Sequence, residues 1–486
     1  MGKVYLIGAG PGDPELMTLK AVRMLKKCTA VMYDRLAGAN ALKHLNEGCK
    51  IFYCGKAPGC HYKSQDEINE MLVTLAKEGH IVGRVKGGDP YVFGRGGEEA
   101  LRLLNEGIDF EVIPGVTSAI SVLSYAGIPV THRGLSQGFH VFTGMSAEKL
   151  NINWEGVSSL NGTLIFLMGL EHIYGITRNL INSGKSIETP CAVVMRGTTA
   201  KQKKVVGTLA DIALKVKEAL FTSPCIIVVG DVVTLGEDLN WYEKMPLFGL
   251  NICTTRSVEQ SKSINEKLVD LGAEVTEINS IKIKRSQFEL DSVKHNLSEY
   301  DHIIFTSVNA VNIFFDYILE NEIDIRSLKG KFAVIGPATE KCLKDRGVIP
   351  DTVAEEFISE DLFHKLNTKI KAEDKILIPC SKHSRAYLSD KLRSCGAIVD
   401  IVHIYEPICG ELTDVNAFEN VDLVVFTSPS TVKNMIKLVG LDAIKQKKSV
   451  AIGPITAKEL ELNGIKPFVC NEYSEDGIIS KILELN

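Results

Sequence analysis

Three glycine-rich segments in the first half of the chain carry the residue types that could bind a ligand. They are Gly-Ala-Gly-Pro-Gly-Asp at 8–13, the run from Arg84 to Glu99, and Pro-Gly-Val-Thr-Ser at 114–118. Glycine lets backbone approach a ligand closely. The segments add carboxylates and hydroxyls, which suit a cationic, hydroxyl-bearing ligand better than a phosphate. S-adenosylmethionine, with its sulfonium, ammonium and ribose diol, is a ligand of that kind.

The first segment superficially suggests a dinucleotide-binding turn. The third glycine of that fingerprint would fall on position 13, which is Asp13. Pro11 removes a backbone N–H donor, and a carboxylate at a helix start opposes a phosphate. The alternative is a tight strand-to-helix turn with Asp13 as the N-cap.

The other two segments also allow two interpretations. Five glycines within eleven positions, 87–97, exceed what a turn needs, and Asp89 stands where a phosphate site would have a lysine. Thr117 and Ser118 stand at a predicted helix start, where they would cap the helix whether or not they bind a ligand.

The elements that must position these segments follow an α/β pattern. Short apolar, β-branched runs alternate with helical segments along the whole chain, which is typical of sheets buried on both faces. Predicted strands include 4–7, 81–85, 163–168, 225–229, 303–306, 333–335, 376–378 and 423–427. A segment without clear periodicity, 236–249, marks the predicted boundary between two halves.

The second half contains an internal repeat, which predicts two related α/β lobes with a cleft between them. Three segments recur in the same order, namely 251–283 with 375–407, 301–311 with 421–432, and 332–347 with 450–464. Ligands of open α/β sheets bind at the carboxyl ends of strands. We therefore expect Thr306, Ser307, Thr427 and Ser428 at the rims of the cleft.

Composition excludes several functional classes. The net charge is -5, with +2 in residues 1–245 and -7 in 246–486, so we expect no nucleic-acid partner. No apolar run approaches the length of a membrane span, and the first residues show no signal-peptide pattern. The spacing of Cys49, Cys54, Cys60 and His61 is unlike a zinc site. We expect no metal, reduced thiols and a cytoplasmic protein.

Residues 1–245 resemble the uroporphyrinogen-III C-methyltransferase family of tetrapyrrole methylases. The motifs are VYLIGAGPGDPELMTLKA, VMYDRL, CGKAPG, RVKGGDPYVFGRGGEE, VIPGVTSAISVLSYAGIPVTHRG and SPCIIVVGDVV. The resemblance implies a two-lobed α/β methylase outside the Rossmann class, and a homodimer. It also implies that S-adenosylmethionine methylates uroporphyrinogen III at C2 and C7 to give precorrin-2.

The motif positions imply the site residues of this half. The cofactor would contact Pro11, Gly87, Gly88, Asp89, Val92, Thr117, Ser118, Met168 and Gly197. Asp34 would accept a proton from the methylated ring, or merely form a salt bridge with Arg35 or cap a loop. Lys56 would donate a proton or hold a substrate carboxylate. Substrate carboxylates would be bound by Arg35, Arg84, Arg95 and Arg133. Cys225 departs from the alanine that the family pattern favours.

Residues 250–486 resemble uroporphyrinogen-III synthase. The motifs are TTRSVEQ, GAEV, IIFTSVNAVNIFF, VIGPATEKCLKDRG, FISEDL, VVFTSPSTVKNM and AIGPITAKELELNG. The implied reaction closes hydroxymethylbilane into a ring while inverting the last pyrrole. Tyr405 would assist departure of the hydroxyl or pack at a hinge. The cleft candidates are Thr254, Thr255, Arg256, Ser307, Thr339 and Thr427. Lys382 and Arg385 would pair with carboxylates or form a solvated helix start, and the arginine that the family often carries near Cys380 is absent.

The two resemblances predict one bifunctional enzyme, because the product of the second half is the substrate of the first. The predicted domains are a methylase at 1–245 and a synthase at 246–486, with lobes at 250–284 plus 407–486 and at 285–406. Both substrates are small tetrapyrroles. The alternative is a methylase of another substrate joined to a bilobed binding module without catalysis.

Overall fold

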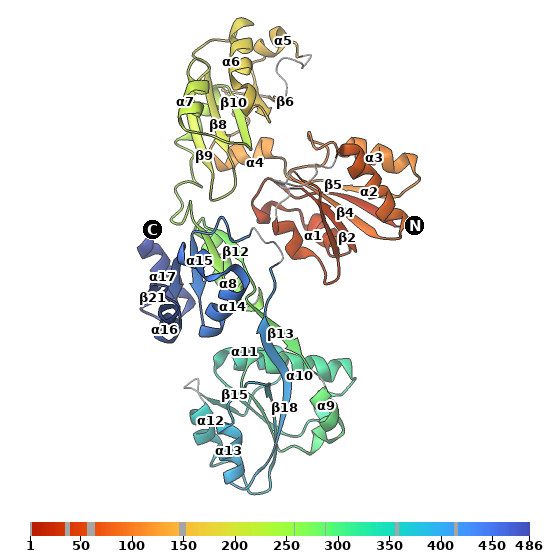
Figure 1. Cartoon of the computed structure of the whole chain (residues 1–486), viewed down its shortest axis with the longest axis vertical. Coiled ribbons are helices and arrows are strands. Elements are labelled where there is room, and N and C mark those ends of the chain that lie inside the picture. The colour runs from red at the N-terminus through yellow and green to blue at the C-terminus, as the bar shows by residue number, and fades with distance from the viewer. Residues whose placement is uncertain are drawn as a thin grey trace. The chain divides into compact units, whose positions relative to one another are not determined.

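The computed structural model describes residues 2–34, 39–55, 64–144, 152–256, 258–286, 288–354, 359–412 and 417–486 (Figure 1). The chain forms two compact units. The first comprises Met1–Ile278, Leu412–Val432 and Val439–Asn486, and the second comprises Asn279–Glu411 and Lys433–Leu438. Among the described residues, no helix has both the length and the apolar character needed to cross a bilayer.

The first lobe of the N-terminal half is a parallel sheet of order β3-β2-β4-β1-β5. Its strands are β1 (Lys3–Gly8), β2 (Ala30–Tyr33), β3 (Lys50–Tyr53), β4 (Ile81–Lys86) and β5 (Phe110–Ile113). Apolar side chains of α2 and α3 pack on one face, and those of α1 and η2 on the other. The helices are η1 (Pro14–Leu16), α1 (Leu19–Leu25), η2 (Ala39–His44), α2 (Gln65–Lys77) and α3 (Gly96–Asn105), where η marks a 3-10 helix.

The second lobe of this half is a mixed sheet of order β6-β7-β10-β8-β9, in which only β6 and β7 are parallel. Its strands are β6 (Phe139–Thr143), β7 (Thr163–Leu167), β8 (Pro190–Met195), β9 (Lys203–Thr208) and β10 (Cys225–Val229). Helices α5, α6 and α7 cover one face, and α4 and η4 the other. The helices are α4 (Ser118–Tyr125), α5 (Trp154–Ser158), η3 (Leu170–His172), α6 (Ile173–Asn182), α7 (Ile212–Glu218) and η4 (Asp231–Gly236).

The C-terminal half adds a third sheet to the first unit, with parallel order β12-β11-β19-β20-β21. Its strands are β11 (Asn251–Thr254), β12 (Glu274–Glu277), β19 (Leu423–Phe426), β20 (Lys448–Ala451) and β21 (Pro467–Val469). Its helices are α8 (Val258–Asp270), α14 (Pro429–Val439), α15 (Leu441–Lys445), α16 (Pro454–Leu462) and α17 (Glu475–Leu485).

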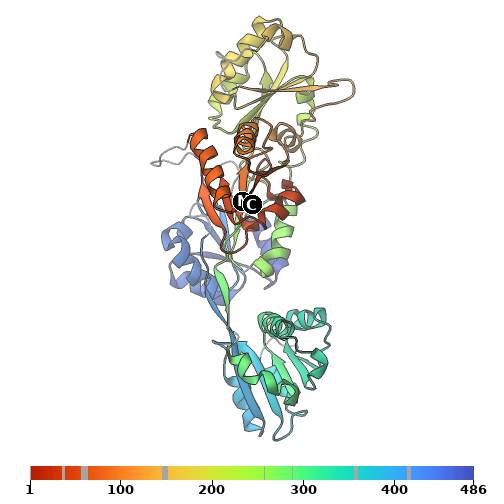
Figure 2. The ribbon, with the colours of Figure 1, turned by 90° about the vertical axis from the view of Figure 1, so that its right-hand side faces the viewer.

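The second unit contains the sheet β13-β18-β17-β14-β15-β16, in which only β13 is antiparallel to its neighbour. Helices pack on both faces of this sheet (Figure 2). The strands are β13 (Ile281–Arg285), β14 (His302–Phe305), β15 (Lys331–Ile335), β16 (Thr352–Ala354), β17 (Lys375–Ser381) and β18 (Ile398–Cys409). The helices are α9 (Phe288–Val293), η5 (Lys294–Glu299), α10 (Val308–Glu320), η6 (Ile325–Ser327), α11 (Pro337–Asp345), α12 (Ser359–Leu366) and α13 (Tyr387–Ser394).

The predicted α/β fold and the internal repeat are confirmed by strand order. The order β12-β11-β19-β20-β21 matches β18-β17-β14-β15-β16, strand for repeated strand. Each sheet therefore combines one early and one late repeat segment. The repeated Gly-Pro turns at Gly336 and Gly453 start α11 and α16, where proline at the first helical turn removes a donor that has no helical partner.

Candidate active sites

The three glycine-rich segments of the first half meet at the carboxyl edge of the first sheet. The Gly10 and Gly88 backbones exchange hydrogen bonds of 3.2 and 2.7 Å. Asp89 Oδ2 accepts a hydrogen bond from Gly115 N at 3.0 Å. A Cβ on Gly115 would lie 2.2 Å from Gly88 O and 2.8 Å from Gly8 Cα. Only glycine fits where these segments approach one another. The glycines of the three motifs therefore allow the segments to assemble into one site.

Asp13 holds the first of these segments in place. Its carboxylate accepts the Glu15 backbone N–H at 2.8 Å, which makes it the N-cap of η1 as the turn interpretation predicts. The Tyr125 hydroxyl donates to the same carboxylate at 2.6 Å. Burial, together with Asp13, raises the pKa of Tyr125. Asp13 therefore acts inside the protein, where it joins the first segment to α4.

The candidate cofactor residues of the first lobe lie in these loops. Pro11, Gly87 and Gly88 are partly exposed, and Val92 is exposed. Thr117 is the N-cap of α4, its Oγ1 accepting the Ala119 N–H at 3.4 Å. Ser118 is the first residue of that helix. Both interpretations of the Thr-Ser pair stay open, since capping leaves the two side chains partly exposed.

Two further candidates come from the second lobe. Met168 follows the buried strand β7, has a positive φ of 54°, and is 44% exposed. A Cβ on Gly197 would lie 2.3 Å from Val122 Cγ1 on α4. The next residue, Thr198, accepts the Asp13 backbone N–H on its Oγ1 at 3.2 Å. The Arg-Gly-Thr loop of the second lobe is thus in contact with the first glycine segment.

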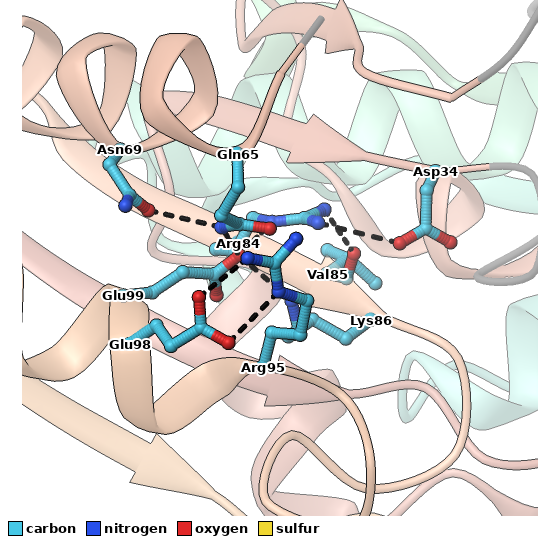
Figure 3. Close-up of polar contacts among 9 residues, drawn as sticks. All are labelled: Asp34, Gln65, Asn69, Arg84, Val85, Lys86, Arg95, Glu98 and Glu99. Atoms are coloured by element: carbon cyan, nitrogen blue, oxygen red, sulfur yellow. Dashed lines mark hydrogen bonds and ion pairs between the residues drawn. The ribbon is translucent and has the colours of Figure 1, made fainter. Parts of the chain in front are cut away.

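A buried charge cluster lies behind Asp34 (Figure 3). Glu99 on α3 is fully buried, and its Oε1 accepts Arg84 Nε at 3.1 Å and Lys86 Nζ at 2.8 Å. Arg84 Nη2 reaches Asp34 Oδ2 at 3.4 Å. Burial lowers the pKa of Lys86, and the Arg84 charge lowers it further, against the attraction of Glu99. We call Glu99, Arg84, Lys86 and Asp34 the Glu99 cluster.

The Glu99 cluster fixes the positions of the Arg84 and Asp34 side chains. Arg84 is only 3% exposed and its guanidinium is directed at Glu99 and Asp34, not at solvent. This placement differs from the predicted carboxylate clamp, because β4 is covered by α2 and α3. Asp34, at the end of β2, pairs with Arg84. Arg35 and Lys56 lie outside the described residues.

The other two described candidate arginines of this half are at the surface. Arg95 pairs with Glu98, with Nε–Oε1 at 2.9 Å and Nη2–Oε2 at 2.6 Å. Arg133 is exposed in the loop between α4 and β6. Their predicted contacts with substrate carboxylates stay predictions.

Four synthase candidates lie on the first unit, at the adjacent carboxyl ends of β11 and β19. Thr255 is buried and its hydroxyl donates to Val425 O at 2.8 Å. Thr254 is buried, and its Oγ1 has no partner among the described residues. Burial lowers the pKa of Arg256. Thr427 is partly exposed directly after β19.

The other synthase candidates lie on the second unit. The Tyr405 hydroxyl on β18 is 2.9 Å from Ser307 Oγ, and Ser307 also caps α10. Burial raises the pKa of Tyr405, although the Ser307 hydrogen bond opposes this. The Tyr405 phenol therefore keeps its proton near neutral pH. Thr339 is 4% exposed on α11, and Lys382 Nζ lies 3.5 Å from Glu406.

A cavity of about 520 Å³ lies at the carboxyl ends of β14, β15 and β17 in the second unit. Arg385 lines it, as does His403, whose Nδ1 is 3.2 Å from Glu289. The sequence did not indicate that His403, Ser384 and Tyr387 line a cavity at the strand ends. The signal that would have found them is the rule that ligands bind at strand carboxyl ends. The full lining is Thr306, Ile335, Ser359, Glu360, Ile378, Cys380, Ser384, Arg385, Ala386, Tyr387, Leu388, Ser389, Ile401 and His403.

Comparison with known proteins matches each half of the chain to its own family, and one relative matches both halves together. The model of the tetrapyrrole (corrin/porphyrin) methylases matches residues 3–213, and that of uroporphyrinogen-III synthase HemD matches 262–480. The porphyrin biosynthesis protein HemD of Ruminiclostridium josui is 36% identical over 495 residues, spanning 100% of this chain and 98% of that protein. The chain belongs to this family of fused methylase and synthase. Its N-terminal half is the methylase and its C-terminal half the synthase.

The methylase half also matches stand-alone proteins. The S-adenosyl-L-methionine-dependent uroporphyrinogen III methyltransferase of Methanosarcina barkeri is 48% identical, over 49% of this chain and 94% of that protein. The crystal structure of uroporphyrin-III C-methyl transferase from Thermus thermophilus, complexed with S-adenyl homocysteine, shares 39% identity. That match covers 48% of this chain and 100% of the other, with a TM-score of 0.42.

Proposed function

We propose that the chain cyclises hydroxymethylbilane to uroporphyrinogen III and then methylates that product at C2 and C7 to give precorrin-2. The convergence of the three glycine segments beside Asp34, in a chain that matches a HemD protein along its whole length, carries this proposal. The match along the whole chain favours catalysis by both halves over a synthase half that only binds its substrate. The domains are residues 1–245 and 246–486, with synthase lobes at 250–284 plus 407–486 and at 285–406.

The methylase site fits S-adenosylmethionine on the chemistry of its residues. The loops present glycine backbone and the partly exposed hydroxyls of Thr117 and Ser118, which match a ribose diol and an amino acid group. The exposed Met168, directly after β7, offers a polarisable thioether. When bound, S-adenosylmethionine supplies an electrophilic methyl group. Pro11, Gly87, Gly88, Asp89, Val92 and Gly197 complete the proposed contacts.

Asp34 is the proposed proton acceptor in methylation. A pyrrole carbon that gains a methyl group becomes part of a cationic ring, which must lose a proton to the protein or solvent. The Asp34 carboxylate is partly exposed, and Arg84 holds it from behind at 3.4 Å. This contact keeps the Asp34 carboxylate in place directly after β2, where a general base could accept the proton. Arg35, Arg95, Arg133 and Lys56 are proposed to bind the substrate carboxylates.

Tyr405 is the proposed proton donor in ring closure. Its neutral phenol can donate a hydrogen bond to the departing hydroxyl of the bilane, and Ser307 at 2.9 Å orients that phenol. Loss of water leaves an azafulvene, which closes through a spiro intermediate. The enzyme then mainly holds the chain in a productive shape. The threonines at the strand ends, together with Arg256, are proposed to hold the substrate side chains.

We further propose a metal-free, cytoplasmic homodimer formed through the methylase half. The eleven described cysteines are all free thiols, which supports a reducing compartment. Analytical ultracentrifugation tests the dimer directly.

The experiment for the methylase supplies uroporphyrinogen III and S-adenosylmethionine to wild type and to Asp34→Asn. Wild type adds two methyl groups. We expect the variant to methylate about 100-fold more slowly, in the range for loss of a general base. Ring closure by the synthase half of the same variant serves as the folding control. Full methylation by Asp34→Asn contradicts the assigned role.

A further inference from the structure

The loop that carries Gly197 lies between the proposed cofactor site and the synthase half, within the first unit. This Gly197 loop, residues 196–202, joins β8 to β9. On one side, Gly197 packs against Val122 of α4, and Thr198 Oγ1 accepts the Asp13 backbone N–H at 3.2 Å. The loop therefore contacts two elements that form the cofactor site.

The other side of the Gly197 loop is bound by the synthase half. Glu274 on β12 accepts the Ala200 backbone N–H on its Oε2 at 3.2 Å. Lys201 Nζ donates to both carboxylate oxygens of Asp422 at 3.1 Å. Asp422 itself accepts the backbone N–H of Asn251 at 2.9 Å, at the start of β11. Glu274 on β12 and Asp422, the residue before β19, thus bind the consecutive loop residues Ala200 and Lys201.

The backbone of the loop needs such support. Arg196 and Thr198 have positive φ values of 47° and 66°, a conformation that residues with a Cβ rarely adopt. Such conformations persist when the surroundings hold them. Inside the methylase half, Gln202 Oε1 accepts the Thr198 N–H at 2.9 Å. The contacts from Glu274 and Asp422 supply the support on the far side.

We propose that Glu274 and Asp422 of the synthase half are positioning residues for methylation, because they hold the Gly197 loop in the conformation that binds the cofactor. This inference rests on the proposed function of Gly197 at the cofactor site. It makes the affinity of the methylase for its cofactor depend on the synthase half to which it is fused.

The test measures binding of S-adenosylhomocysteine to the full-length protein by titration calorimetry. Glu274→Ala removes the acceptor for Ala200 N and is expected to weaken binding about threefold to tenfold, the effect of one hydrogen bond. Glu274→Gln keeps a carbonyl oxygen there and is expected to restore most of the affinity. Lys201→Met, changed on the methylase side alone, is expected to weaken binding similarly. All three variants are expected to keep synthase activity at the wild-type rate.

The matched control is Lys43→Met. Lys43 Nζ lies 3.5 Å from Glu277 Oε1, so this variant also removes one lysine and one ion pair between the same two halves. It leaves the Gly197 loop untouched and is expected to bind like wild type. Wild-type affinity in both Glu274→Ala and Lys201→Met overturns the inference, as does equal weakening in Lys43→Met. If Glu274→Ala also loses synthase activity, the affinity of Lys201→Met for S-adenosylhomocysteine tests the inference by itself. A wild-type protein that binds no S-adenosylhomocysteine would instead refute the proposed function.

Discussion

Glu99→Gln tests whether the Glu99 cluster holds the first lobe together. The substitution keeps the shape of the side chain but leaves Arg84 and Lys86 as two buried cations without their shared carboxylate. Removing one partner of a buried ion pair costs about 3–5 kcal/mol. Lys86 can shed its proton, since burial already lowers its pKa, so we expect the lower end, about 3 kcal/mol. That is roughly a 150-fold change in the equilibrium for local opening.

Native-state hydrogen exchange of the β4 amides measures this change. We expect those amides to exchange about 100-fold faster in Glu99→Gln, and methylation to slow because Asp34 loses its support. Glu106→Gln, at the C-cap of the same helix, is the control and should leave β4 unchanged. Lys86→Met combined with Glu99→Gln should recover part of the protection. Less than tenfold faster exchange in the single variant would refute the reasoning.

Three further predictions concern other parts of the chain. Gly197→Ala places a Cβ 2.3 Å from Val122 Cγ1, an overpacking that costs about 1–3 kcal/mol. Calorimetry should therefore show weaker binding of S-adenosylhomocysteine, and adding Val122→Ala should restore it. Unchanged binding in Gly197→Ala would contradict the packing argument. Tyr405→Phe should slow ring closure about tenfold or more while methylation of supplied uroporphyrinogen III continues, and an unchanged rate would leave Tyr405 a packing residue. Burial lowers the pKa of His302 in the folded state, so the stability it contributes is present above pH ~6.5 and is lost as pH falls through the folded-state pKa. The urea midpoint should therefore drop less between pH 7.5 and 5.5 in His302→Gln than in wild type, and equal drops would contradict this.

Most of the fold could be predicted from the sequence, because its strands are buried on both faces. β1 and β10 read as continuous apolar runs and are buried along nearly their whole length. The repeat predicted two related α/β lobes, and the two synthase sheets share one strand order. The antiparallel pairs of β10 with β7 and β8 were not predicted, since a run buried on both faces reads alike in either direction.

The site could be predicted where backbone geometry demands glycine, and less well where side chains pair. The residue types of the three glycine-rich segments already indicated a common ligand, and the structure brings Gly8, Gly88 and Gly115 of these segments into contact. The sequence did not show that Arg84 is buried. Its partner Glu99 lies fifteen residues away on α3, and only the packing of α3 on β4 joins them.

The most direct test of the account follows hydroxymethylbilane through the full-length protein, with and without S-adenosylmethionine, resolving products by mass and isomer. We expect uroporphyrinogen III alone without S-adenosylmethionine, and the same ring with two added methyl groups when it is present. Formation of only the type I ring, which closes spontaneously, would contradict the synthase assignment. A type III ring that is never methylated would contradict the methylase assignment.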